Sequence, residues 1–223
     1  MSKPLRIDFV SDISCTWCAI ALPTLERAVE NVVIDATADF NFQPFELNPQ
    51  MPQGGQNLIE HMEQKYGLGS AQVHQHFDMT RRRGEEVDFV FDLDDDSRIY
   101  NTFDAHRLLH WAKLQGRQRE LKHALFDSHF TDRQDPGDRE VLIRLADSVG
   151  LDPAEARGML ESDAYSAEVR DAESEWLKQG VQSVPAVIFN RRVAVSGAQS
   201  QEVFENAIRR ALADTPDEDP KNI

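Results

Sequence analysis

The two cysteines of this 223-residue chain, Cys15 and Cys18, lie three positions apart, at the junction of an apolar run and a helical pattern. Residues 5–11 form a short apolar run with little alternation, which predicts a buried strand. Apolar residues then recur at helical spacing over 21–32, and Pro23 indicates a kink about two turns in. The sequence therefore predicts a strand, a turn that holds the Cys-x-x-Cys pair, and a helix that begins at the pair.

The rest of the chain carries clear strand and helix signals. A second strand is expected over 36–47, where Pro44 indicates an edge or a bulge. The following stretch is helical, with helices expected over 57–66, 70–83, 101–115, 117–130, 138–149, 153–161 and 165–179, and a non-helical crossing over 87–96. Two closely joined runs, 186–190 and 193–196, predict an antiparallel hairpin, and a last helix is expected over 201–212.

This order of elements predicts the fold class. Without a helical block of about 120 residues, the chain reads βαβ followed by ββα, an α/β arrangement with the layout of the thioredoxin fold. We therefore predict a thioredoxin-like domain formed by residues 1–56 and 181–213, with an all-helical domain, 57–180, inserted between its halves. Residues 214–223 are expected to form a flexible acidic tail.

Composition and charge exclude several classes of function. The chain has 39 acidic and 24 basic residues, a net charge of −15, which argues against a nucleic-acid partner because phosphate binding needs clustered basic residues. No apolar run is long enough to cross a membrane, and no targeting segment is visible at the start. The sequence thus predicts a cytoplasmic protein without a membrane partner. In a reducing compartment, a single close cysteine pair indicates catalysis or metal binding rather than a structural disulfide.

The position of the pair at a helix start predicts different roles for its members. The first turn of a helix has unpaired backbone N–H groups and a positive dipole end, which stabilise a thiolate at Cys15. Cys18 lies about one turn further in and is expected to be more shielded. Cys15 is therefore predicted to be the nucleophile that forms a mixed disulfide, and Cys18 the resolving thiol that closes the internal bond.

Two other interpretations of the pair are weaker. A structural zinc site needs two further ligands, and the chain has no other cysteine; the histidine pairs His74/His76 and His106/His110 are distant in sequence. Unreactive core cysteines would not need the strand–turn–helix placement. No metal and no cofactor are therefore predicted.

A second signal lies just before the closing hairpin. Pro185 precedes the strand at 186–190 and follows Val184, the place that the cis-proline occupies in thioredoxin-fold enzymes. There the cis bond leaves the preceding backbone free to pair with an extended substrate. An ordinary trans proline at a strand start is the alternative. Trp17, inside the cysteine motif, is expected to lie exposed near the thiols as a surface for substrate recognition.

The motifs together resemble the DsbA-like thioredoxin family, and its FrnE-like branch in particular. The matching segments cover about residues 5–212 and are Phe9-Val10-Ser11-Asp12 with Trp17, Pro44-Phe45-Glu46-Leu47-Asn48-Pro49, Asn101-Thr102 with Ala105-His106-Arg107-Leu108-Leu109, Gly180-Val181 to Val184-Pro185, and Ser196-Gly197-Ala198-Gln199. The resemblance implies a helical domain inserted into a thioredoxin fold and a Cys-x-x-Cys site that faces the cis-proline loop.

The sequence departs from this branch beside both cysteines. Thr16 stands where the branch commonly has proline, and Ala19 where it commonly has tyrosine. Because residues between the cysteines adjust the redox potential, the direction of the reaction stays open. His106 and His110, four residues apart on one helix face, are hypothesised to line the groove above Cys15, with a surface or core pair as the alternative.

The predicted function is that of a thiol–disulfide oxidoreductase acting on disulfide or dithiol substrates, with glutathione or a thioredoxin-type reductant as partner. One rival is a glutathione-dependent enzyme of the same fold, such as a kappa-type transferase or a 2-hydroxychromene-2-carboxylate isomerase; these resemble one another in using a serine where Cys15 stands. The intact pair favours redox chemistry. The other rival is a non-catalytic binding module or chaperone with a vestigial pair.

Overall fold

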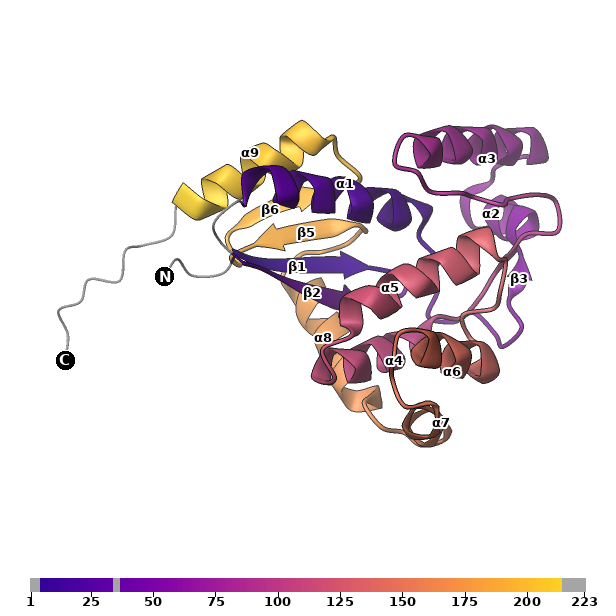
Figure 1. Ribbon diagram of the computed structural model, residues 1–223. Coiled ribbons are helices and arrows are strands. Elements are labelled where there is room, and N and C mark those ends of the chain that lie inside the picture. The colour runs from indigo at the N-terminus through magenta and orange to yellow at the C-terminus, as the bar shows by residue number, and fades with distance from the viewer. Residues whose placement is uncertain (1–4, 34–36, 214–223) are drawn as a thin grey trace.

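The computed structural model describes residues 5–33 and 37–213 (Figure 1). Its central sheet has the strand order β2-β1-β5-β6, formed by β1 (Leu5–Ser11), β2 (Ala38–Pro44), β5 (Ala186–Phe189) and β6 (Val193–Ser196). Strand β1 is parallel to β2 and antiparallel to β5, and β5 and β6 form the expected hairpin. The predicted α/β thioredoxin fold is confirmed. The expected tail, 214–223, and residue 36 of the expected second strand lie outside the described residues.

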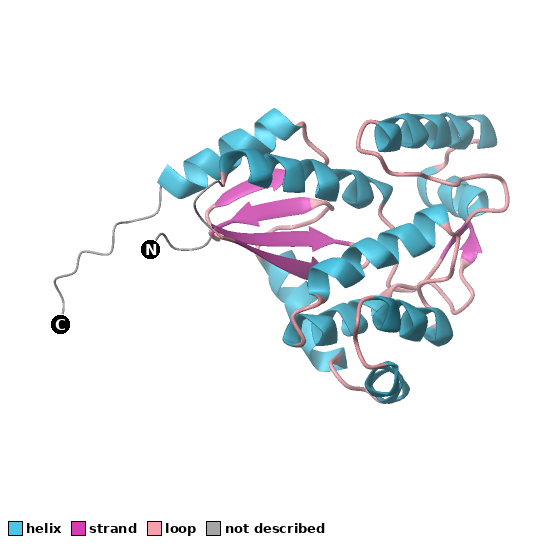
Figure 2. Ribbon diagram, viewed as in Figure 1, coloured by secondary structure: helices cyan, strands magenta, loops and turns pink. Residues whose placement is uncertain are grey.

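Helices cover both faces of this sheet. Helix α1 (Thr16–Val32) and helix α9 (Gln201–Ala213) pack side by side over one face, while α8 (Ser166–Lys178) lies on the other (Figures 1 and 2). Strand β1 is central and nearly all buried, which explains why its sequence shows little alternation. Helix α1 continues through Pro23 without a break in its assigned helical structure.

The expected helices of the 57–180 stretch are confirmed, with small changes at their ends. They are α2 (Leu58–Tyr66), α3 (Ser70–Glu85), α4 (Phe103–Leu114), α5 (Gln118–Phe126), α6 (Arg139–Ser148), α7 (Pro153–Glu161) and α8. Side-chain caps set three starts, because Asn57, Asp138 and Asp152 each accept hydrogen bonds from the first-turn N–H groups. The crossing over 87–96 is non-helical, as expected.

Three local features differ from the expectation. The second strand ends at Pro44, at the edge of the sheet, where proline has no N–H to continue the ladder. The helix expected over 117–130 ends at Phe126 and continues as a π-helical turn, η1 (Asp127–Thr131). A two-residue antiparallel pair, β3 (Gln56–Asn57) and β4 (Arg98–Ile99), was not predicted because two residues carry no periodicity.

The buried apolar residues form two main clusters. One lies between the sheet and helices α1 and α9, includes Cys18 and extends to Phe126 and Phe130 of the helical block. The other lies among α4, α5, α6 and α7, and Ile13 from the cysteine turn joins it. The cysteine turn is therefore fixed from both sides. Each helix within the described ranges is too short or too polar to cross a bilayer.

Candidate functional site

Cys15 is the N-cap residue of α1. Its backbone is extended (φ −93°, ψ 105°), and its Sγ accepts the backbone N–H of Cys18 at 3.2 Å. This is the position in which a side chain satisfies one of the unpaired N–H groups of a helix start. Both cysteines are free thiols; Cys15 is 5% exposed and Cys18 is fully buried. The geometry therefore distinguishes an outer thiol from an inner one, as the sequence predicted.

The loop before β5 lies against the outer thiol. The Sγ of Cys15 is 3.8 Å from the carbonyl oxygen of Val184, a residue 169 positions later. The Val184–Pro185 peptide bond is cis, and the Pro185 carbonyl accepts the N–H of Gly197 at 2.8 Å, which joins this loop to the end of β6. The fold thus brings together Cys15 and Val184, while Pro185 is buried behind them.

A cavity of about 590 Å³ opens beside Cys15. Cys15, Trp17 and Val184 line it from the thioredoxin-like part, and helices α2 and α3, the segment 92–100 and the turn η1 form its other walls. Trp17 is half-buried in this wall, less exposed than the sequence analysis expected. Leu47 and Asn48, from the motif that follows β2, also line the cavity.

Asp12 lies behind the pair, fully buried at the end of β1. Its carboxylate accepts the Leu47 N–H at 2.7 Å and the Ser14 hydroxyl at 2.9 Å, and its Oδ1 lies 3.5 Å from the Nε2 of His106. Burial disfavours its charge, but the nearby His106 imidazole and the hydrogen bond from the Leu47 N–H outweigh this cost and lower the pKa of Asp12 to about 2. A carboxylate is therefore held ionised directly before the cysteine turn.

Lys122, on α5, is also fully buried in this region. Its Nζ has no hydrogen-bond partner within the described part of the chain and lies 4.5 Å from the centre of the Phe126 ring. Burial lowers the pKa of Lys122 to about 8, and its charge interacts with Cys18, Asp12 and Cys15. Burial is also the main cause that raises the pKa of Cys18, while Lys122 acts in the opposite direction. The ammonium group is thus the nearby positive charge that favours a thiolate at Cys18.

His106 does not occupy the place that the hypothesis gave it. Its side chain is buried beside Asp12 and Lys122, and it does not line the cavity at Cys15. His110, one turn later, is half-buried, with its ring 5.1 Å from that of Tyr165. Helix α4 packs this face inward, so His106 faces the Asp12 side of the cysteine turn. Direct contact with a substrate in the cavity is not available to it.

Sequence reasoning missed the roles of Asp12 and Lys122. A signal was present for each: Asp12 is a charged residue directly after the buried strand, and Lys122 falls on the apolar face of α5, between Leu121 and Leu125. A lysine on such a face is rare unless it has a partner. No group of three or more His, Cys, Asp or Glu side chains that could hold a metal lies among residues 5–33 and 37–213.

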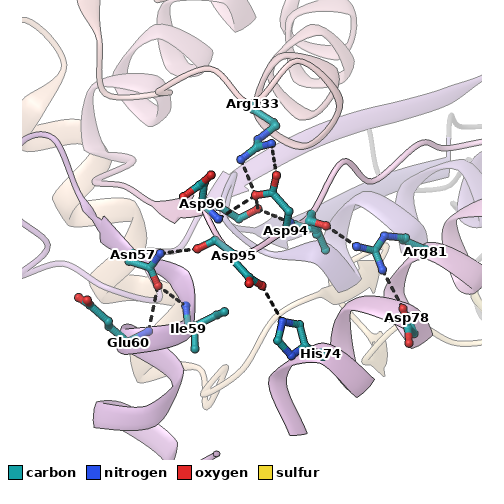
Figure 3. A network of polar contacts seen from close by, with 12 residues as sticks. Asn57, Ile59, Glu60, His74, Asp78, Arg81, Asp94, Asp95, Asp96 and Arg133 are labelled. Carbon is teal, nitrogen blue, oxygen red and sulfur yellow. Dashed lines mark hydrogen bonds and ion pairs between the residues drawn. The ribbon is translucent and has the colours of Figure 1, made fainter. Parts of the chain in front are cut away.

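Polar side chains tie α2 and α3 to the segment that closes the far side of the cavity (Figure 3). Asn57 donates to the Asp95 carbonyl at 2.7 Å, and His74 of α3 lies 2.6 Å from the Asp95 carboxylate. Arg133 binds Asp94 through two nitrogens at 2.5 Å. The walls of the cavity are therefore joined to one another by these side chains as well as by the short β3–β4 pair, and Arg133 joins them to the segment that follows η1.

The fold and site define a thioredoxin-like protein with two thiols at the first turn of α1. The family model described as the DSBA-like thioredoxin domain matches residues 6–209. The crystal structure of a probable DsbA oxidoreductase from Streptomyces coelicolor is 31% identical in sequence, with a TM-score of 0.90 over 96% of this chain and 92% of that one. This chain therefore belongs to the DSBA-like thioredoxin domain family.

Two further similarities widen the comparison. The uncharacterized protein YwbO of Bacillus subtilis is 27% identical over 205 residues, which is 92% of this chain and 96% of that protein. A structure of 2-hydroxychromene-2-carboxylate isomerase has a TM-score of 0.69 at 12% identity and covers 92% of this chain and 95% of its own. The latter similarity concerns the fold alone.

Proposed function

We propose that this protein is a thiol–disulfide oxidoreductase in which Cys15 is the nucleophile and Cys18 the resolving thiol. The observation that carries the proposal is the asymmetry of the pair: Cys15 caps α1, accepts the Cys18 N–H and lines a cavity, whereas Cys18 is fully buried. Only the outer thiol can meet a substrate first. Membership of the FrnE-like branch, a cytoplasmic location and the domain division 1–56, 57–180 and 181–213 belong to the proposal and rest on the sequence.

The reaction proceeds in two exchanges. The Cys15 thiolate attacks one sulfur of a substrate disulfide, forms a mixed disulfide and releases the other sulfur as a thiolate that takes up a proton. Cys18, as a thiolate, then attacks the Sγ of Cys15 and releases the second substrate thiol. The pair loses two electrons, the substrate disulfide gains them, and a dithiol or two molecules of glutathione restore the reduced pair.

The groups around the pair have separate proposed roles. Val184 offers its carbonyl, 3.8 Å from the Cys15 Sγ, and Trp17 offers a ring in the cavity wall, so both are assigned to substrate binding, with Pro185 fixing the loop. Lys122 favours the Cys18 thiolate when that cysteine must attack, because an ammonium in a dry interior acts strongly on a nearby anion. His106 is reassigned from substrate binding to holding the Asp12 carboxylate.

The test is the redox equilibrium of the purified protein in glutathione buffers. Tryptophan fluorescence should follow it, and alkylation with mass measurement identifies the oxidised residues. A reversible Cys15–Cys18 disulfide with a potential between about −120 and −270 mV supports the proposal. Failure to form an internal disulfide, with only a stable glutathione adduct on Cys15, overturns it.

The glutathione-dependent isomerase or transferase of the same fold is the second candidate, because the fold similarity to an isomerase covers nearly the whole chain. Such an enzyme needs no second thiol, so its activity survives Cys18→Ala. A dithiol oxidoreductase loses turnover in that variant and accumulates a mixed disulfide on Cys15. A binding module or chaperone would instead retain peptide binding when both cysteines are replaced by serine.

A further inference from the structure

We infer that the cavity beside Cys15 is a binding site for a low-molecular-mass, uncharged organic disulfide with apolar or aromatic substituents. This inference rests on the proposed function and names its substrate class. It separates the protein from oxidoreductases that act on extended polypeptides.

The Cys15 thiol is nearly closed off from bulk solvent. Cys15 is only 5% exposed, yet it lines the cavity, so the cavity is the route by which another sulfur reaches it. Helices α2 and α3 and the segment 92–100 form walls beyond the thiol. They are fixed by the contacts of Asn57, His74 and Arg133 (Figure 3). A folded protein is bulkier than the space between these walls, whereas a small disulfide fits within it beside Cys15.

The cavity has the size of a small-molecule site. Its volume of about 590 Å³ lies within the range of about 300–1,000 Å³ that small-molecule sites occupy. The walls are mainly apolar, and their apolar side chains come from both parts of the fold, among them Trp17, Leu47 and Val184 from the thioredoxin-like part and Met62, Phe77 and Phe130 from the helical block. Burying an apolar ligand against such walls is favourable in proportion to the area removed from water.

The charged side chains of the lining balance one another. Its charged members are Asp92, Asp96, Arg98 and Arg133, whose formal charges cancel. Arg133 already binds Asp94, and Arg98 donates hydrogen bonds to the backbone carbonyl oxygens of Gly54 and Gly55.

Two of the three histidines in the lining, His61 and His129, add little positive charge. Burial lowers the pKa of His129 to about 4 and lowers that of His61, so both rings are neutral at pH 7. His76, on α3, is exposed at the cavity and is the remaining histidine of its lining. Since the formal charges cancel and both arginines have partners, the lining favours an uncharged substrate over an anionic one.

The chemistry at the site follows the two exchanges of the proposed function. The Cys15 thiolate attacks R–S–S–R within the cavity, the first R–S⁻ leaves and is protonated by solvent, and Cys18 displaces the second. The substrate gains two electrons and two protons to become two R–SH, and the protein pair becomes a disulfide. A dithiol reductant restores the pair, so turnover requires its presence in the assay.

The test compares three disulfides with the pre-reduced protein in single-turnover reactions. The probes are 4,4′-dithiodipyridine, which is aromatic and uncharged at neutral pH, 5,5′-dithiobis(2-nitrobenzoate), which is aromatic and dianionic, and insulin. Each rate is divided by the rate with dithiothreitol to remove intrinsic reactivity. We expect the normalised rate for the uncharged probe to exceed the other two by about tenfold or more, which corresponds to about 1.4 kcal/mol of binding preference.

A matched pair of variants tests whether the cavity causes this preference. Met62→Trp places a larger side chain in the cavity wall, and Met79→Trp makes the same change on α3 at a residue that is 39% exposed and outside the cavity. We expect the first to reduce the normalised rate for dithiodipyridine about tenfold and the second to change it less than about twofold. The redox potential of the Cys15–Cys18 pair is measured in both variants and should equal that of the parent protein. An equal potential shows that the substitution has left the cysteine pair intact.

The outcomes separate the substrate class from the proposed function. The small-disulfide inference would be overturned by equal normalised rates for all probes, by a preference for insulin, or by equal effects of the two tryptophan variants. In each of these cases a reversible Cys15–Cys18 disulfide would still support the proposed oxidoreductase. Absence of that internal disulfide overturns the proposed function itself, whatever the probe rates are.

Discussion

The two sides of the cysteine pair differ sharply in their chemistry. On the side of Cys15, a cavity of about 590 Å³ has mainly apolar walls whose formal charges cancel. On the side of Cys18, Asp12, His106 and Lys122 are buried together. About one helical turn separates the two thiols. One short motif therefore faces an apolar cavity on its outer side and, on its inner side, a set of charges that acts on the second thiol.

Both environments are built largely by the helical block rather than by the sheet. Helices α2 and α3 supply much of the cavity wall, while His106 comes from α4 and Lys122 from α5. The thioredoxin-like part supplies the cysteines, Asp12 and the loop at Val184. Substitutions on the two sides should therefore have different kinds of effect.

Replacing the thiols should separate the two sides most strongly. Cys15→Ser is expected to abolish disulfide exchange, by at least about a thousandfold, because a serine hydroxyl does not take part in sulfur exchange at neutral pH. Cys18→Ala should leave the first exchange and stop the second, so that a mixed disulfide accumulates on Cys15. Mass measurement after reaction with dithiodipyridine checks both. An adduct on Cys18 in Cys15→Ser at the wild-type rate would contradict the assignment.

Lys122→Met should impair the inner side while making the protein more stable. Without the ammonium, the Cys18 thiolate loses its nearby positive charge, and the resolving step is expected to slow about tenfold, which stopped-flow fluorescence can follow. Burial lowers the pKa of Lys122 from 10.5 to about 8, which corresponds to a cost of about 3 kcal/mol for keeping it charged at pH 7.

Replacing Lys122 should also change the stability of the protein, and Lys113 provides the control. Denaturant unfolding at pH 7 should show a gain in the free energy of unfolding of up to about 3 kcal/mol for Lys122→Met. Lys113→Met, on the half-exposed end of α4, serves as the control and should leave the resolving rate unchanged. A Lys122→Met protein that is less stable and resolves at the normal rate would show that this lysine has only a structural role.

His129, in the cavity wall, should make stability depend on pH between about 4 and 6.5. Burial lowers its pKa from 6.5 to about 4, so the unfolded chain binds a proton in this window and the folded chain does not. The free energy of unfolding should fall by about 3 kcal/mol as the pH drops from 6.5 to 4. His129→Phe should remove this slope, and an unchanged slope would contradict the assignment.

Asp12 should give a smaller effect in a more acidic window. Its pKa is lowered from 3.8 to about 2. The contribution of Asp12 to the free energy of unfolding is therefore fully present above about pH 4 and is lost as the pH falls through 2. The loss amounts to about 2 kcal/mol. Asp12→Asn should flatten the stability curve between pH 4 and 2 but not between 6.5 and 4. Equal flattening of both windows would show that the two groups are not independent.

The sequence predicted the architecture well because its signals are local. The apolar run at 5–11, the helical spacing after Cys18 and the closing hairpin each reflect which residues are buried within one element, and the structure confirms them. The ends of elements were less well predicted. The π-helical turn after Phe126 depends on contacts with neighbouring segments, which no local pattern records.

The candidate site was predicted only in part, because only some of its residues are marked by local patterns. Cys15 and Cys18 could be found because their spacing and position at a helix start are local, and Val184 because it precedes a recognisable strand. The hypothesis for His106 identified a helix face but not the side of the cysteine turn that this face meets. That direction is set by how α4 packs.

Patterns along the chain were enough to predict the main helices and strands in their order, the excess of acidic charge and the position of two thiols at the first turn of a helix. Packing in three dimensions was needed to show that α2 and α3 enclose an apolar cavity beside Cys15, and that Lys122 lies within electrostatic reach of Cys18 from more than a hundred residues away. The physical reason is that backbone periodicity depends on neighbours along the chain. Burial, desolvation and charge interactions depend on neighbours in space.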